Sequence, residues 1–502
     1  MYKNNHLCAR LHAASAFRGG DIFVQGAYPR SFAQFFKNAE RYASALLSMG
    51  LRPGDRVAVQ VEKSIEAVEL YIGTVLAGGV FLPLNPAYMP DEIDYFLQDA
   101  TPFVFVSDPE SGSLATPAAK VVAHVLTLNA KGQGSLMAAL PADSHDFTPV
   151  PRRDNDLAAI LYTSGTTGRS KGAMLSHKAL ASNAAVLAKY WQFTPQDVLI
   201  HALPIFHTHG LFVAINTVLM AGASMIFQPG FDAKSIISAM PEASVLMGVP
   251  TFYTRLLREA DLAMASRNMR VFISGSAPLL AQTHADWQAC TGHAILERYG
   301  MSETNMNTSN PYEGARKPGT VGVALPGVEV KITDAKGNAL PAGKTGMIEV
   351  RGDNVFSGYW QMPEKTTEEL RKDGWFITGD LGVQDDQGYI SIVGRAKDMI
   401  ISGGFNVYPK EVEDVLNAQP EVCESAVIGI AHPDFGEAVV GVLVLVAKTE
   451  FDQSAMAGKL AKKLANYKCP KLIYIVGSLP RNAMGKVQKK ALRAKYAECF
   501  AP

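Results

Sequence analysis

Hydrophobic positions in the first hundred residues follow two spacings that alternate along the chain. A spacing of three to four residues, which is typical of an amphipathic helix, covers residues 32–50, 64–79 and 90–98. Short continuous apolar runs, which are typical of buried strands, cover residues 56–61, 80–84 and 103–106. Strands that alternate with helices in this way predict α/β layers built around buried sheets.

The pattern is weaker after residue 106, where residues 107–155 predict a strand, a helix and a loop. A stretch from His209 to Asp232 has no Lys, Arg, Asp or Glu before its last residue, but polar residues and glycine interrupt it. We therefore predict a buried helix near 210–221 and a strand near 224–228 there, and no membrane span. Near the C-terminus, the pattern predicts a helix over 408–416 and a strand over 438–446.

A glycine- and hydroxyl-rich loop, YTSGTTGRSKG, is predicted from Tyr162 to Gly172. It follows the apolar run 157–161 and precedes an Ala/Leu-rich helix for which Ser176 is a suitable N-cap. Strand, loop and helix in this order cradle phosphate, because backbone N–H groups, hydroxyls and a lysine converge on an anion. A surface linker is the alternative interpretation. A Walker loop is excluded, because Lys171 is followed by glycine and not by serine or threonine.

Bulk composition adds little to this picture. The 502 residues correspond to about three domain-sized units. Lys plus Arg and Asp plus Glu number 47 each, so charge indicates neither nucleic acid nor a membrane as partner. The five scattered cysteines predict free thiols in a reducing compartment, the cytoplasm. Residues 1–20 lack acidic side chains, as in a mitochondrial leader, but a short amphipathic helix near 7–17 is the better interpretation.

The string from Tyr162 to Gly172 resembles the signature of the adenylate-forming superfamily, which comprises acyl-CoA synthetases, luciferases and peptide-synthetase adenylation domains. Further motifs follow in the superfamily's order: LPIFHTHG at 203–210, GVPTFYTRL at 248–256, ISGSAPL at 273–279, ERYGMSET at 297–304, WFITGD at 375–380, GRAKD at 394–398, SGGF at 402–405 and PRNAMGKV at 480–487. The resemblance implies a large N-terminal α/β domain of layered sheets and helices, residues 1–396. It also implies a small mobile α+β lid, residues 398–502, with the hinge at Lys397.

The resemblance also implies a nucleotide site. Its phosphate loop comprises Thr163, Ser164, Gly165, Thr166, Thr167, Gly168 and Lys171. Adenine and ribose are expected at Gly275, Ser276, Ala277, Glu297, Arg298, Tyr299, Gly300, Met301, Thr304, Asp380 and Arg395. In relatives the tyrosine stacks on adenine, the threonine touches the α-phosphate and the aspartate accepts the ribose hydroxyls. Mg²⁺ is expected at Glu303 with Thr163, because a carboxylate suits a hard cation.

The acyl pocket is expected at His207 and Ser274, with Arg255 for the substrate carboxylate. A zinc site at His207 and His209 is disfavoured, since two ligands cannot close it. Helical periodicity alone places Arg255 beside Arg258 and Glu259 on a solvated face, with Phe252, Leu256 and Ala260 as the apolar stripe. A resemblance to malonyl-CoA synthetases instead turns Arg255 inward, towards the distal carboxylate of malonate.

In the C-terminal part, Lys486 matches the catalytic lysine of the superfamily, Gly404 matches the turn where CoA enters, and Lys397 matches the pivot. Relatives are switched off by acetylation of that lysine, so a lysine acetyltransferase acting on Lys486 is an expected partner.

The implied reaction joins malonate, and methylmalonate as a near-analogue, to CoA through an acyl-adenylate, with ATP and CoA as co-substrates. Three alternatives stay open. The chain could activate another short or aromatic acid, it could bind nucleotide without turnover, or it could be a luciferase-like oxygenase, for which fold analogy is a weak warrant.

Overall fold

A computed structural model describes residues 2–26, 29–143, 147–163, 170–447, 449, 451–482 and 485–500. The chain forms two compact units. The first comprises Met1–Glu329 with Val350–Phe376, and the second comprises Val330–Glu349 with Ile377–Pro502. The predicted pivot, Lys397, lies inside the second unit; its role as a hinge stays a prediction.

The first sheet of the first unit has the strand order β6-β5-β3-β4-β7-β8. The first five strands in this order run parallel, and β8 pairs antiparallel with β7 at the edge. The bounds are β3 Arg56–Gln60, β4 Val80–Pro83, β5 Val104–Ser107, β6 His124–Thr127, β7 Leu157–Thr163 and β8 Lys171–Ser176. Burial of the central strands on both faces explains their continuous apolar runs.

The second sheet has the order β15-β14-β13-β12-β11-β9-β10-β1-β2. Its bounds are β1 Ile22–Gln25, β2 Arg30–Ser31, β9 Val198–His201, β10 Ser224–Phe227, β11 Val245–Gly248, β12 Val271–Ser274, β13 Leu296–Met301, β14 Asn305–Ser309 and β15 Val323–Ala324. Strands β9, β11, β12 and β13 run parallel, so their carboxyl ends meet at one edge of the sheet. Ligand sites of open α/β sheets form at such an edge.

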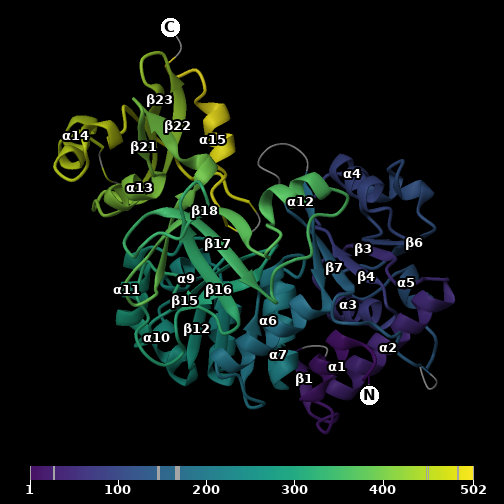
Figure 1. Cartoon of the computed structure of the whole chain (residues 1–502). Coiled ribbons are helices and arrows are strands. Elements are labelled where there is room, and N and C mark those ends of the chain that lie inside the picture. Colours follow the sequence, from purple (N-terminus) through teal and green to yellow (C-terminus); the bar gives the residue numbers. More distant parts are fainter. Residues whose placement is uncertain are drawn as a thin grey trace. The chain divides into compact units, whose positions relative to one another are not determined.

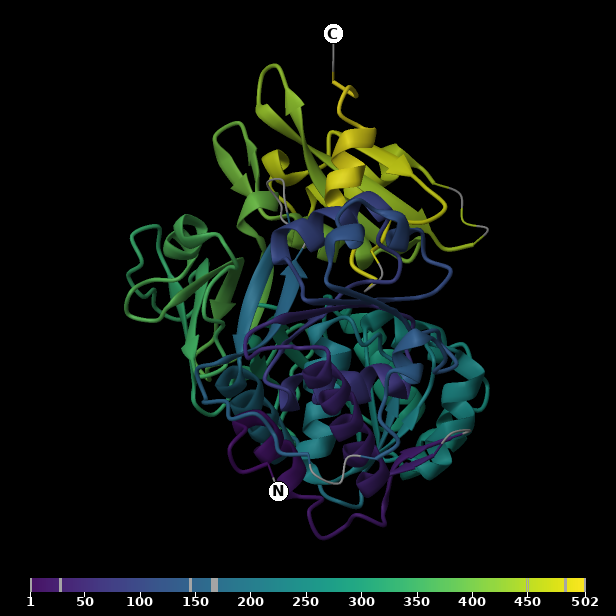
Figure 2. The ribbon, with the colours of Figure 1, turned by 90° about the vertical axis from the view of Figure 1, so that its right-hand side faces the viewer.

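Helices pack on these sheets, as Figures 1 and 2 show. Their bounds are α1 His6–Ala13, α2 Phe32–Ser48, α3 Ile65–Leu76, α4 Pro90–Ala100, α5 Ser135–Ala138, α6 His177–Tyr190, α7 Asn216–Ala221, α8 Ala233–Ala239, α9 Pro250–Leu256, α10 Leu262–Ala265, α11 Ala281–Thr291 and α12 Pro363–Glu369. Helices α2 and α3 lie against each other, because Gly73 admits the neighbouring helix: a Cβ there would be 2.6 Å from the Tyr42 Cβ.

The second unit holds most of the sheet β16-β17-β18-β19 and the sheet β21-β20-β23-β22, with β24 beside β23. The strand bounds are β16 Val328–Thr333, β17 Gly346–Gly352, β18 Phe376–Gln384, β19 Ile390–Arg395, β20 Ile400–Ser402, β21 Phe405–Val407, β22 Val422–His432, β23 Gly436–Leu445 and β24 Leu472–Ile475. Helices α13 Pro409–Asn417 and α14 Gln453–Ala461 share one apolar core with β22 and β23, and α15 Lys489–Lys495 joins another. The alternating faces of this hairpin therefore contribute to two cores.

Most predicted elements are present with shifts of one to three residues at their ends. Ser176 caps α6 as predicted, with its side chain accepting from the Ala179 N–H. The predicted N-terminal helix is shorter, because it ends at Ala13 and Phe17 is exposed. The helix near 210–221 begins as a π-helical turn, His209–Ile215, and continues as α7. The expected order of strand, loop and helix at 157–191 was wrong, since β8 separates the loop from α6.

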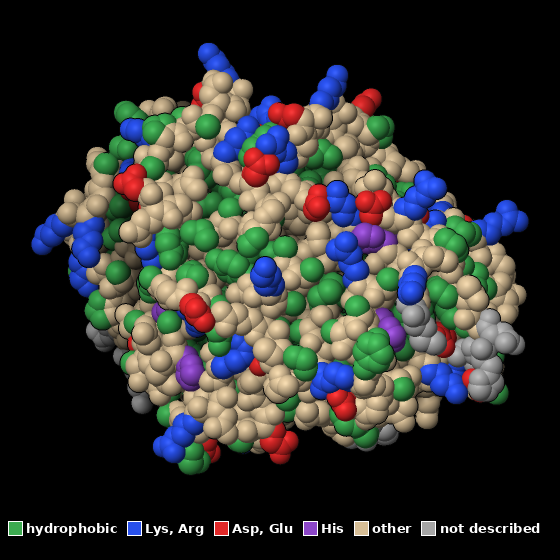
Figure 3. Space-filling model, turned by 60° about the horizontal axis from the view of Figure 1, so that its bottom comes forward, with side chains coloured by type: hydrophobic (Ala, Val, Ile, Leu, Met, Phe, Trp, Pro, Cys, Tyr) green, Lys and Arg blue, Asp and Glu red, His purple; other side chains and the backbone are tan. Residues whose placement is uncertain are grey.

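The described residues contain no helix with the length and apolarity that a membrane crossing requires. All five cysteines are free thiols, as predicted. On the face drawn in Figure 3, basic and acidic side chains are interspersed, in agreement with the balanced charge of the sequence.

Candidate functional site

The predicted phosphate loop lies between the antiparallel strands β7 and β8. Ser164, Gly165, Thr166, Thr167 and Gly168 lie outside the described residues, so their contacts with phosphate stay a prediction. The two ends of the loop are fixed: Thr163 pairs with Lys171 across the strands. The Tyr95 hydroxyl donates to the Ser170 carbonyl at 3.0 Å. A helix N-terminus does not follow the loop, so the helix dipole is not part of this cradle.

Lys171, the first residue of β8, lies in a network of charged and polar groups. Its ammonium group is 3.1 Å from each carboxylate oxygen of Glu369 and 3.1 Å from the Tyr359 hydroxyl. The Tyr359 hydroxyl lies 2.6 Å from Glu369 and 3.1 Å from the Glu303 carboxylate. Burial raises the pKa of the Tyr359 phenol, and the carboxylates of Glu303 and Glu369 raise it further. The phenol therefore stays protonated and donates its one hydrogen to a carboxylate, Glu369 being the nearer of the two.

Glu303 lies in the turn between β13 and β14 and is 5% exposed. Gly300 makes this turn possible, because a Cβ there would lie 1.8 Å from the Asn305 carbonyl oxygen. The neighbouring Thr304 is fully buried, and its hydroxyl finds no hydrogen-bond partner in the described part of the chain. A buried hydroxyl in this condition is a donor and acceptor that other groups at the turn can still use.

Of the residues expected around adenine, those on and directly after β12 and those on β13 lie on neighbouring parallel strands, with Ser274 opposite Glu297. Gly275, Ser276 and Ala277 follow β12 directly, and Ser276 adopts a positive φ of 72°. On β13, Glu297 accepts from the Gly319 N–H at 3.3 Å and Tyr299 is 7% exposed. Met301 is the last residue of β13, so it lies at the carboxyl-terminal edge of the sheet.

Arg298 differs from its neighbours on β13. Its guanidinium lies over Gly275, where a Cβ would be 2.4 Å from the guanidinium carbon. The residue is 3% exposed, and neither Nε nor Nη2 has a partner among the described residues. Burial lowers the pKa of Arg298 to about 9. Side chains alternate between the two faces of a strand, so period-two spacing already separates Arg298 from Glu297 and Tyr299. This alternation predicts that Arg298 contacts a different part of a ligand from Glu297 and Tyr299.

Three further buried polar atoms without described partners lie in the segments around Arg298: Thr208 Oγ1, His209 Nε2 and Ser274 Oγ. Burial lowers the pKa of His209, and the charges of Arg298, His201 and His207 add to the shift. His209 is therefore neutral, and its other nitrogen lies 3.2 Å from the Ser276 hydroxyl. Donors without partners around a buried guanidinium fit an anionic ligand. The sequence had shown His209 only as a weak metal candidate.

His207 is half-buried beside Phe206, and burial lowers the pKa of its imidazole to about 4. The loop that carries it is closed by His201, whose Nε2 lies 2.8 Å from the Gly210 carbonyl. Lys63 donates to the His201 Nδ1 at 2.9 Å and to its carbonyl at 2.8 Å. Gly210 is required here, since a Cβ would lie 2.0 Å from the Pro204 carbonyl oxygen.

Arg255 lies on α9 and is exposed, with its guanidinium 5.5 Å from the Phe231 ring centre. Phe231 packs on Phe252, which is buried as the helical stripe predicts. The helix ends at Leu256, so the predicted stripe through Ala260 was too long. The role of Arg255 in binding a carboxylate stays a prediction.

In the second unit, Asp380 is 5% exposed and its carboxylate binds Arg395 at 2.8 Å. Lys486 is exposed as a residue, yet loss of solvent around its ammonium group lowers its pKa. Arg395 lowers that pKa further, whereas Asp380 and Asp398 oppose the shift. Lys397 lies in the same cluster, and burial lowers its pKa too.

The Gly403-Gly404 turn has φ values of 58° and 82°. A Cβ at Gly404 would have no atom within 4 Å, so the turn is open above this residue.

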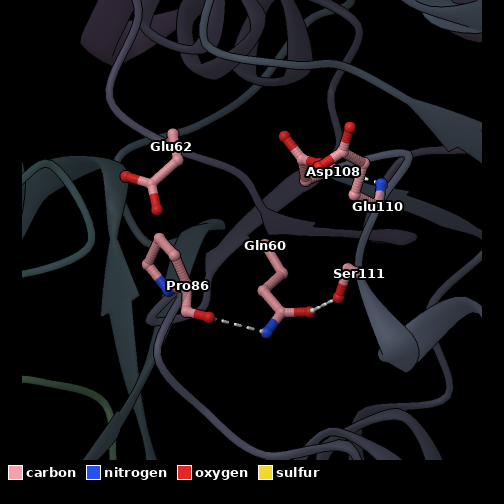
Figure 4. A pocket seen from close by; sticks show the side chains of 6 residues that line it. All are labelled: Gln60, Glu62, Pro86, Asp108, Glu110 and Ser111. Carbon is pink, nitrogen blue, oxygen red and sulfur yellow. Dashed lines mark hydrogen bonds between the residues drawn. The ribbon is translucent and has the colours of Figure 1, made fainter.

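A depression at the carboxyl ends of β3 and β5 is lined by Gln60, Glu62, Pro86, Asp108, Glu110 and Ser111 (Figure 4). The Gln60 amide bridges the Pro86 carbonyl and the Ser111 hydroxyl, so its polar atoms are satisfied. None of the residues expected to bind substrate lines it.

The profile described as AMP-binding enzyme matches residues 11–360, and that of the AMP-binding enzyme C-terminal domain matches residues 411–486. A malonate–CoA ligase of Arabidopsis thaliana is 36% identical, with 88% of this chain and 78% of the relative covered. A feruloyl-CoA synthase of Amycolatopsis is 34% identical, with 97% and 96% covered. The crystal structure of ATP-bound MatB from Rhodopseudomonas palustris superposes with a TM-score of 0.96, at 56% identity, with 99% of this chain and 100% of that chain covered.

Two buried histidines predict a pH-dependent stability. Burial lowers the pKa of His177 and of His201 to about 3 each, and the cations Arg152 and Lys63 contribute. The unfolded chain takes up these protons below pH ~6.5, so stability falls as pH drops from there towards 3, by up to about 1.4 kcal/mol per pH unit for each histidine. In His201→Gln, the stability lost between pH 6.5 and 5 should be smaller by up to about 2 kcal/mol, as measured by urea denaturation.

The matched control is His124→Gln, at a partly exposed position of β6. An equal pH dependence in wild type and His201→Gln would contradict the neutral state of the buried imidazole.

Proposed function

Because the chain belongs to the AMP-binding enzyme family, we propose that it ligates malonate to coenzyme A, with cleavage of ATP to AMP and pyrophosphate. Relatives that carry the name malonate–CoA ligase, and MatB at 56% identity, support this choice. A feruloyl-CoA synthase at 34% identity means that the family name alone does not decide the acid. The acid must be argued from the pocket.

The observation that carries the proposal is the buried Arg298 guanidinium with free Nε–H and Nη2–H groups in the described part of the chain. Malonate has two carboxylates, of which one reacts and the other needs a partner. A guanidinium binds a carboxylate through two parallel hydrogen bonds, which is a strong and directional pairing. Acetate would leave Arg298 buried and unpaired, at a cost of about 2–5 kcal/mol. We therefore assign the distal carboxylate to Arg298.

Ser274 and the loop of His207 and His209 complete the pocket in this proposal, with neutral imidazoles that donate or accept without repelling Arg298. Arg255 is assigned to the pocket entrance. Its exposure and its contact with Phe231 fit a cation that attracts a dianion from solvent, where screening weakens each contact.

In the first half-reaction, the other malonate carboxylate attacks the α-phosphorus of ATP and pyrophosphate leaves. Both groups are anionic, so the protein contributes position and positive charge. Lys486 neutralises the charge that develops on the transferred group. Asp380 and Arg395 hold the ribose, Tyr299 packs on the adenine, and Thr304 donates its unpaired hydroxyl to the α-phosphate.

The donor set at the β13–β14 turn fits Mg²⁺. The buried Glu303 carboxylate is a hard oxygen ligand, and the Thr163 hydroxyl at the end of β7 is another group of this kind. Mg²⁺ takes one or two such protein oxygens beside phosphate and water. When bound, the ion supplies charge neutralisation for the phosphates. The Tyr359 hydroxyl oxygen lies 3.1 Å from the Glu303 carboxylate.

In the second half-reaction, the CoA thiol releases its proton to solvent and attacks the acyl carbon of malonyl-adenylate as the thiolate, and AMP leaves with the electron pair of the broken C–O bond. The open turn at Gly404 admits the pantetheine arm, and Lys397 is the proposed pivot between the two half-reactions. All five cysteines lie outside these motifs, in agreement with a mechanism that uses no enzyme thiol.

Substrate choice provides the test of this function. CoA-dependent AMP formation should be fastest with malonate, slower with methylmalonate and very slow with acetate. Arg298→Met, which fills a similar volume without charge, should lower kcat/KM for malonate by about 30-fold to several thousandfold, the equivalent of about 2–5 kcal/mol. Arg255→Ala should lower it less, because exposed charges contribute little.

Activity only on monocarboxylates would agree with an acyl-CoA ligase but would contradict malonate as its substrate. Full malonate activity in Arg298→Met would contradict the assignment of the distal carboxylate.

Lys486 provides a second test, which also concerns the proposed acetyltransferase. Acetylation would remove the charge of the Lys486 ammonium group. Lys486→Gln, as a mimic, should lower malonate-dependent ATP–pyrophosphate exchange by about a hundredfold or more. The rate of CoA acylation from supplied malonyl-adenylate should change little. Lys490→Gln, at an exposed position four residues away, is the control, and equal losses in both variants would contradict the role.

A further inference from the structure

Lys171, at the end of the predicted phosphate loop, already has a compensated charge, because it forms an ion pair with Glu369. Lys171 Nζ lies at an equal 3.1 Å from both carboxylate oxygens, and the two side chains are only 19% and 23% exposed. The ammonium also lies 4.2 Å from the Tyr359 ring centre. Lys171 therefore has a fixed place and a counter-ion before any phosphate arrives.

Backbone pairing fixes the two residues independently of each other. On one side, Lys171 pairs with Thr163 of β7. On the other side of β8, the Trp360 N–H donates to the Gly172 carbonyl at 2.8 Å, and the Met174 N–H donates to the Gly358 carbonyl at 3.0 Å. Helix α12, with Glu369 at its end, follows this segment directly. Only the flexible lysine stem has to move for the pair to open.

Glu369 keeps other partners when Lys171 leaves. Lys365 lies 3.0 Å from one carboxylate oxygen, and the Tyr359 hydroxyl donates to the other at 2.6 Å. Burial opposes ionisation of Glu369, but these donors together with Lys171 hold the pKa of its carboxyl below the usual value. Opening the pair therefore leaves no unsatisfied buried charge on α12, which is the usual obstacle to breaking a buried ion pair.

The same hydroxyl of Tyr359 lies 3.1 Å from Glu303, the carboxylate proposed for Mg²⁺. The ion pair and the proposed metal position are therefore connected through one side chain. A nucleoside triphosphate that binds at Glu303 through its metal would place phosphates with a larger negative charge than Glu369 close to Lys171.

We propose that Glu369 is a resident counter-ion of the phosphate loop, which positions Lys171 and is exchanged for the β- and γ-phosphates when MgATP binds. This inference rests on the proposed assignment of Lys171 to the nucleotide phosphates. Glu369 is a positioning residue in this scheme, because it acts on the nucleotide through Lys171.

The exchange makes a prediction of unexpected sign. Removal of an acidic side chain that competes for Lys171 should tighten MgATP binding. The pair is partly exposed, so its interaction free energy is modest. Glu369→Gln should therefore lower the Kd of MgATP by about fivefold, as measured by calorimetry without malonate. The Kd of AMP, which lacks the exchanged phosphates, should change by less than about twofold.

The chain offers a matched control on the same helix. Glu368 is bound by Lys365 at 2.7 Å and its side chain is 63% exposed. Glu368→Gln removes the same charge one residue away, so any effect of general electrostatics on MgATP appears in this variant too. We expect less than about a 1.5-fold change in its Kd.

A double-mutant cycle with Lys171→Met completes the test. Lys171→Met should weaken MgATP binding, and Glu369→Gln should have no further effect in that background. Weaker MgATP binding in Glu369→Gln would overturn the proposal that Glu369 is a counter-ion of Lys171. An equal tightening in the wild-type and Lys171→Met backgrounds would overturn it too. Unchanged MgATP binding in Lys171→Met would instead contradict the assignment of Lys171 to the phosphates. If Glu369→Gln does not fold, Glu369→Asp, which withdraws the carboxylate by one methylene, should show tightening in the same direction.

Discussion

The proposed acyl site depends on a buried guanidinium whose Nε and Nη2 have no hydrogen-bond partner among the described residues. Arg298 is 3% exposed and lies on Gly275, the one residue type that leaves room for it. An uncompensated cation in this environment destabilises the fold unless a ligand pairs with it. The substrate's second carboxylate is that partner in our account. The same buried guanidinium therefore both selects the substrate and destabilises the fold when no substrate is bound.

The segments around Arg298 are held by contacts that come from distant parts of the chain. Lys63 follows β3 of one sheet, and it binds His201 at the end of β9 in the other. His201 in turn contacts the carbonyl of Gly210, which lies at the π-helical start, His209–Ile215, of the next element. Placement of the polar atoms of Thr208 and His209 therefore depends on both sheets, which is how a pocket with few polar groups can be well oriented.

Much of this arrangement could be predicted from the sequence. Apolar runs identified the parallel strands, Ser176 identified the start of α6, and the ordered motifs identified the family. Strand β8 was missed, because it forms by pairing on one side with β7 and on the other with residues 357–360, which no local pattern shows. Tyr359 and Glu369 were missed for the same reason, since they reach Lys171 from almost two hundred residues away. The resemblance grouped Arg298 with the residues expected around adenine, whereas strand alternation puts its side chain on the other face of β13 from Glu297 and Tyr299, which is why we propose a different partner for it.

The most direct measurement of the central claim is the affinity of a stable malonyl-adenylate analogue compared with its acetyl counterpart, in wild type and in Arg298→Met. Our account predicts that wild type binds the malonyl compound more tightly by about two orders of magnitude, and that Arg298→Met removes this preference. A malonyl preference that persists in Arg298→Met would contradict the account, because the distal carboxylate would then be recognised elsewhere.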